Sequence, residues 1–153
     1  MNKVTITLLI TLSAGLLFFS GCKGKNELQY KSLWGSQWLS GDVVQNGKRV
    51  MWFQLFDQIE EKDKAIKSYK DNKKKINGKY PATISDSMIW ILINDRIEIR
   101  LMADSKNKAY HGKEKLKKFI NMFDLAGLEK ISGPKAKTDD LKKYCPKLKM
   151  VKK

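Results

Sequence analysis

The sequence predicts an α+β domain: an antiparallel sheet, built from a hairpin and a three-stranded meander, with two helices packed on one face and a basic C-terminal tail. Three observations support this class. An Asn-Gly pair lies between two apolar runs, three further apolar runs follow at short intervals, and two segments carry apolar residues at helical spacing. The 153 residues suffice for one domain with terminal extensions.

The first predicted element is a hairpin. Asn46-Gly47 separates residues 42–44 from residues 49–56, and a type I′ turn requires positive φ at both central positions. Residues 49–56 are apolar on both faces, including Trp52 and Phe53, so we expect a central strand with both faces buried.

Residues 57–75 predict a helix. Acidic residues come early and lysines late, which matches the helix macrodipole, and an apolar stripe recurs at helical spacing. Asn77-Gly78 ends the element.

Residues 79–104 predict the meander. Pro81 places the strand at 80–84 near an edge, and residues 88–93, with Trp90, form a continuous apolar run typical of a buried strand. Residues 96–102 alternate strictly, which predicts that Arg96, Glu98 and Arg100 face solvent.

A second helix is predicted after Gly112. One face carries four apolar residues at i, i+3, i+4 and i+7, namely Leu116, Phe119, Ile120 and Phe123. Gly133-Pro134 then interrupts the pattern. Residues 133–153 hold eight lysines and two aspartates, and we expect a tail with at most a short docked helix at 139–145 and loose order at 147–153.

The N-terminus has a different character. Lys3 precedes an uncharged apolar run at 4–19, which ends at Ser20-Gly21-Cys22. This segment resembles the lipobox of bacterial lipoproteins. The resemblance implies cleavage after Gly21, where Ser20 and Gly21 leave room for the peptidase, and lipidation of the Cys22 thiol. It predicts a signal peptide (1–21), a lipid-anchored tether (22–30), the α+β domain (31–132) and the basic tail (133–153).

The resemblance also implies a location in the bacterial cell envelope, with the chain attached to a membrane through its lipid. Lys23, in place of an aspartate, favours the outer membrane, facing the periplasm.

Composition narrows the chemistry. One histidine and two cysteines exclude four-ligand zinc fingers and disulfide scaffolds, and no Gly-rich phosphate loop is present. His111 lies in a loop with no nucleophile or carboxylate at a useful spacing, and Cys145 is expected to be a packed or exposed free thiol, with a disulfide to another chain as the alternative. We therefore predict no catalytic residues, no metal site and no cofactor.

The excess of 31 Lys and Arg over 16 Asp and Glu, a net charge of +15, predicts attraction to anions. The candidate anion-binding residues are the tail lysines, Lys135, Lys137, Lys142, Lys143, Lys147 and Lys149. Nucleic acid is excluded by the exported location.

Two functions fit these features. The first is a non-catalytic binding or assembly module for an anionic envelope component or a partner protein. The second is a periplasmic inhibitor or immunity-type protein that blocks an acidic enzyme or toxin.

We predict that mass spectrometry of the mature N-terminus will find an acylated Cys22. A Cys22→Ser chain should lose both processing and membrane attachment. An unmodified N-terminus at another residue, or a Cys22→Ser chain that is still processed and membrane-bound, would contradict the prediction.

Overall fold

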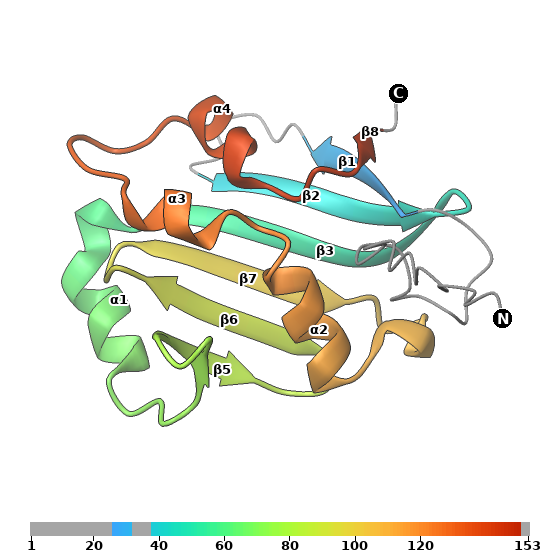
Figure 1. Cartoon of the computed structure of the whole chain (residues 1–153), viewed down its shortest axis with the longest axis horizontal. Helices are drawn as coiled ribbons and strands as arrows, with labels where there is room; N and C mark the ends of the chain where they lie inside the picture. The colour runs from blue at the N-terminus through green and yellow to red at the C-terminus, as the bar shows by residue number, and fades with distance from the viewer. Residues whose placement is uncertain (1–25, 32–37, 151–153) are drawn as a thin grey trace, which may run out of the picture.

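The structure, a computed structural model, describes residues 26–31 and 38–150. The predicted signal peptide, with Ser20 and Gly21, and the predicted lipidation site Cys22 lie outside these residues. Within the described part, one sheet runs in the order β4-β5-β6-β7-β3-β2-β1-β8 (Figure 1). Its strands are β1 (Glu27–Lys31), β2 (Trp38–Gln45), β3 (Lys48–Asp57), β4 (Lys75–Ile76), β5 (Tyr80–Ile84), β6 (Met88–Ile93), β7 (Ile97–Ala103) and β8 (Lys149–Met150).

The helices are α1 (Lys62–Tyr69), α2 (Lys113–Ile120), α3 (Leu125–Glu129) and α4 (Thr138–Leu141). Single 3-10 turns, η1 (Ile59–Glu61), η2 (Lys108–Tyr110) and η3 (Lys142–Tyr144), adjoin them. All strand pairs are antiparallel except β1 with β8. The α+β class is therefore confirmed.

The hairpin forms as its turn residues predict. Asn46 and Gly47 have φ values of 51° and 72°, which are the left-handed conformations that the turn needs. The strand that leaves the turn, β3, lies between β2 and β7 in the middle of the sheet. Strands β5, β6 and β7 form the predicted meander.

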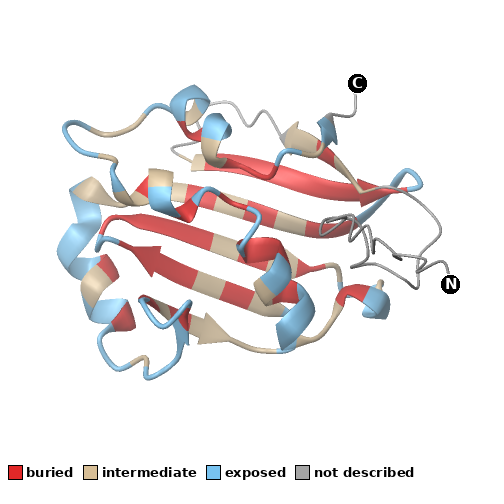
Figure 2. Ribbon diagram, in the orientation of Figure 1, coloured by how far each residue is buried: buried red, intermediate tan, exposed pale blue. Residues whose placement is uncertain are grey.

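The main core lies between one face of the sheet and the helices α2, α3 and α4. Ile91, Ile99, Leu55 and Leu39 form one continuous row across four strands, and each is at most 1% exposed. The predicted apolar face of α2 packs onto such rows. In Figure 2, β2 is buried along nearly its whole length, and buried and intermediate residues alternate along β3.

The two predicted helices do not share a face of the sheet. Ala65 and Tyr69 of α1 pack with Leu92 of β6, whereas α2 contacts the side of β6 that carries Ile89 and Ile91. The expectation of two helices on one face is therefore wrong. Because β6 is apolar on both faces, each face can bury a helix.

The prediction that charged residues of the meander face solvent is wrong for two of them. Arg96 and Glu98 were expected in solvent but are 7% and 3% exposed. Glu98 accepts hydrogen bonds from Tyr69 (2.9 Å) and Gln58 (2.6 Å), while Arg100 also donates to it. Tyr69 and Gln58 come from other segments of the chain, whereas Arg100 lies two residues away on β7. Hydrogen bonds from all three reduce the cost of burying the Glu98 charge.

The face of the sheet opposite the main core is half-buried. It carries Trp52 and Trp90, which were expected to be mostly buried, whereas Phe53 and Ile91 on the core face are 0% exposed. The Arg100 guanidinium lies 4.8 Å from the Trp90 ring centroid and 4.8 Å from that of Phe56. The Arg100 cation and the rings of Trp90 and Phe56 thus form part of this face.

Both ends of the domain differ from the predicted boundaries. Residues 27–30, expected to be tether, belong to β1, where Leu28 is 1% exposed and lies opposite Val43. The tail also belongs to the fold, because Leu141 and Cys145 join the main core and β8 pairs with β1. Two deeply buried residues, Leu141 and Cys145, anchor the tail, and Ala136, Tyr144 and Leu148 pack against the core while partly exposed.

We predict that Gly41→Ala destabilises the domain. A Cβ at Gly41 would lie 2.5 Å from two atoms of the buried Phe53 ring, which packs edge-on against Phe123. Overpacking of this kind costs about 1–3 kcal/mol, measurable by denaturant melts. The penalty should shrink when Phe53→Leu is also present, and an equal penalty in both backgrounds would refute the proposed collision.

Candidate functional site

A buried ion pair joins the end of β3 to the start of β7. Arg96 donates from Nε to Asp57 Oδ1 (2.9 Å) and from Nη2 to Asp57 Oδ2 (2.7 Å). The two side chains are 8% and 1% exposed. The pair forms because the β3–β7 register places Asp57 opposite Ile97, next to Arg96. A bidentate arrangement of this kind is the strongest geometry available to arginine and a carboxylate.

The same two side chains hold the chain that follows α3. Arg96 also donates to the carbonyls of Gly133 (3.1 Å) and Pro134 (2.8 Å), and the Ala136 amide donates to Asp57 Oδ2 (2.7 Å). We call this arrangement the Asp57–Arg96 clamp. Gly133-Pro134, predicted to release the tail, is therefore fixed to the sheet.

The electrostatics of Asp57 agree with this geometry. Burial alone would raise the pKa of its carboxyl group. Hydrogen bonds from Arg96, Ala136 and Ile59 outweigh burial, so the pKa lies below the usual aspartate value. The clamp therefore contains a carboxylate throughout the neutral and mildly acidic range.

A hollow of about 360 Å³ opens beside the clamped segment, and we call it the tail hollow. Its lining combines cationic, apolar and aromatic side chains: Ile131, Ser132, Pro134, Lys135, Ala136, Lys137, Asp140, Leu141, Lys143 and Tyr144. The lining residues thus include three lysines and one aspartate. The hollow can therefore accept an anionic group next to an apolar one.

The structure brings some of the predicted anion-binding lysines together and separates others. Lys135, Lys137 and Lys143 share the tail hollow, and Lys143 Nζ lies 5.0 Å from the Tyr144 ring centroid. Lys147 is exposed, outside the hollow. Three of the predicted lysines form ion pairs: Lys135 with Glu60, Lys142 with Asp139, and Lys149 with Glu27.

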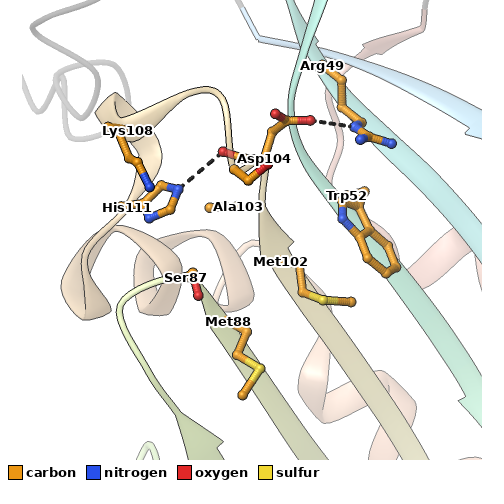
Figure 3. Close-up of a pocket in the computed structure, with 10 residues that line it drawn as sticks. Arg49, Trp52, Ser87, Met88, Met102, Ala103, Asp104, Lys108 and His111 are labelled. Atoms are coloured by element: carbon orange, nitrogen blue, oxygen red, sulfur yellow. Dashed lines mark hydrogen bonds and ion pairs between the residues drawn. The ribbon is translucent and has the colours of Figure 1, made fainter.

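A second hollow, of about 390 Å³, lies on the half-buried face of the sheet, and we call it the strand-end hollow (Figure 3). Trp52, Met88 and Met102 occupy adjacent positions on three neighbouring strands and form its apolar floor. Arg49 Nε pairs with Asp104 Oδ2 at 2.9 Å on the rim. The cations on the rim make this hollow a further candidate for an anionic ligand.

His111 also lies on this rim. It stands in the loop before α2, as the sequence predicted, and its Nε2 is 3.2 Å from the Asp104 carbonyl oxygen (Figure 3). Sequence reasoning missed the hollow as a whole, because only the strand register reveals that Met88, Met102 and Trp52 adjoin. The one available signal was the apolar character of both faces of these strands.

Cys145 is packed rather than accessible. The residue is 5% exposed, and burial raises the pKa of its thiol to about 12. A thiol of this pKa is protonated at neutral pH and is a poor nucleophile.

The described residues contain neither a metal-binding cluster nor a membrane-spanning helix. Within residues 26–31 and 38–150, no cluster of three or more His, Cys, Asp and Glu side chains could hold a metal ion. In the same residues no helix is both long and apolar enough to span a membrane.

Comparison with protein-family models, with curated proteins and with solved structures finds no match to this chain. Its function is therefore inferred from its own residues.

We predict that Asp57→Asn destabilises the domain by about 3–5 kcal/mol at pH 7, because it leaves Arg96 buried without its charge partner. The depressed pKa adds stability above the unfolded-state value of about 3.9, and this contribution is lost as the pH falls below it. Urea melts from pH 7 to pH 3 should show a shallower loss for the variant, and parallel profiles would contradict this role.

Proposed function

We propose that this chain is a lipid-anchored, non-catalytic lipoprotein of the bacterial cell envelope that binds an anionic envelope component or partner protein through the tail hollow. The supporting observation is the coincidence of two independent features. Ser20-Gly21-Cys22 resembles a lipobox, and three of the lysines singled out in the sequence line one hollow of the folded domain.

The form of the tail hollow supports binding rather than catalysis. Lys137 and Lys143 are exposed, whereas Leu141 beneath them is buried. Because the Asp57–Arg96 clamp fixes the segment on the sheet, little chain has to be ordered when a ligand arrives. Lysines supply compact point charges without the fixed fork of arginine, which suits phosphate or carboxylate groups on a flexible polymer.

The location follows from the same proposal. The lipid at Cys22 holds the domain at a membrane, most simply the outer membrane facing the periplasm, where lipopolysaccharide phosphates, other anionic polymers and acidic proteins are present. An inhibitor or immunity-type protein would use the same charges against one acidic enzyme or toxin. Tyr144 and Ile131 in the tail hollow would then contact apolar residues of that partner.

We predict that a Lys137→Gln/Lys143→Gln chain binds an envelope extract about tenfold or more weakly at low salt, because each exposed lysine near an anionic surface contributes about 1 kcal/mol. The matched control is Lys67→Gln/Lys70→Gln, which removes two exposed charges at α1. Binding is measured by pull-down at two salt concentrations.

The recovered material separates the two functions. Salt-sensitive recovery of wall or membrane material supports the envelope module, and one stoichiometric soluble acidic protein supports the inhibitor. Equal binding by the variant and its control would remove the tail hollow from the proposed function.

A further inference from the structure

The position of Cys22 limits how the domain can sit on a membrane. Asn26 follows Cys22 by four positions, and an extended chain of that length spans at most about 14 Å. Asn26 is itself held by the domain, because Tyr110 Oη donates to its side-chain oxygen at 3.2 Å. A lipid on Cys22 therefore keeps the end of the sheet where β1 begins close to the bilayer.

Several connections meet at this end of the sheet, which we call the anchor end. Glu27 lies opposite Val44 near the β2–β3 turn, and the Asp104 amide donates to the Val50 carbonyl at 2.9 Å. The β5–β6 turn joins them, since the Gly112 amide donates to the Asp86 carbonyl at 2.7 Å. Figure 1 shows the β2–β3 turn, the β5–β6 turn and the η2 connection on the same side as the start of β1.

Exposed charges differ between the two ends. The β2–β3 turn and the segment around η2 expose four cations at the anchor end: Lys48, Arg49, Lys106 and Lys108. The anchor end also carries Asp86, Asp104 and Glu27, of which Asp104 is paired with Arg49 and Glu27 with Lys149. The opposite end exposes charges of both signs, because Glu60, Glu61 and Asp63 lie beside Lys62, Lys64 and Lys67 of α1. The four cations of the anchor end favour an anionic surface there.

The strand-end hollow opens at the anchor end and combines the two kinds of contact that a lipid offers. Its floor of Trp52, Met88 and Met102 is apolar, and tryptophan is favoured at the membrane–water interface. Arg49 uses Nε for Asp104 and directs the rest of its guanidinium away from that carboxylate (Figure 3). Lys108 lines the same hollow.

We propose that the strand-end hollow binds the phosphate headgroup of an anionic phospholipid in the leaflet that holds the Cys22 anchor, an inference that rests on the proposed lipidation. Arg49 and Lys108 contact the phosphate, and the Trp52 floor contacts the glycerol and the first acyl carbons. The anchor and the hollow together fix the orientation of the domain.

This orientation has a consequence for the tail hollow. Arg49 and Asp57 are eight residues apart along β3, which corresponds to about 27 Å in an extended strand. Because the Asp57–Arg96 clamp lies at the end of β3 far from the anchor, it turns Lys135, Lys137 and Lys143 toward the periplasm. Of the predicted tail lysines, Lys149 lies at the anchor end, on the strand paired with the start of β1.

The test uses the full lipidated chain in vesicles of phosphatidylcholine with or without phosphatidylglycerol, each containing lipids brominated near the headgroup. Quenching of Trp52 is obtained as the difference between the native chain and Trp52→Phe. We expect strong Trp52 quenching in phosphatidylglycerol vesicles. It should fall by at least half in Lys106→Glu/Lys108→Glu and stay unchanged in the matched control Lys67→Glu/Lys70→Glu.

Two failures are distinguishable. If mass spectrometry finds an acylated Cys22 but Trp52 is not quenched, or is quenched equally in both charge variants, the lipid site is overturned while the anchor stands. An unacylated chain that is washed from the vesicles overturns both. Quenching of equal strength without phosphatidylglycerol also refutes the proposal, because the phosphate of a zwitterionic lipid would then suffice.

Discussion

The Asp57–Arg96 clamp is the interaction on which the position of the segment after α3 depends. A buried ion pair is expensive to desolvate, and here the cost is offset because the remaining donors and acceptors also find partners. Arg96 reaches the carbonyls of Gly133 and Pro134, and Asp57 accepts the Ala136 amide. The chain after α3 is thereby directed back over the sheet, where Leu141 and Cys145 complete the core above β1 and β2. A basic segment that is poor in apolar residues becomes a structured part of the domain, and its lysines acquire fixed positions.

The two ends of the sheet then take different roles in the proposed function. The anchor end joins the short segment after Cys22 to exposed cations and an apolar hollow, and the opposite end carries the clamp and the tail hollow. In the proposed function, the cations of the anchor end face lipid and the lysines of the tail hollow face a partner. This arrangement separates attachment from recognition, so that each can be altered by substitution without the other.

Local signals in the sequence were sufficient for much of the fold. The Asn46-Gly47 turn, the meander and the apolar face of α2 each depend on residues close together in the chain, and all three are confirmed.

The predictions that were wrong depend on contacts between residues far apart in the sequence. Strict alternation placed Arg96 in solvent, because its carboxylate lies 39 positions away. The apolar residues of β6 did not reveal which helix covers which face. The β1 strand was assigned to the tether because one deeply buried side chain, Leu28, is a weak signal among polar neighbours. The strand-end hollow could not be predicted, because it depends on the register between three strands.

The central claim is that the tail is docked by the clamp and presents a preformed basic hollow. Native-state amide hydrogen exchange of the Ala136 and Cys145 N–H groups tests it most directly, because Ala136 donates to Asp57 Oδ2 and Cys145 donates to the Lys142 carbonyl. The account predicts that both amides exchange as slowly as those in the outer strands of the sheet, and that both lose protection in Asp57→Asn. Exchange of both at the rate of an unstructured peptide in the native chain would contradict it.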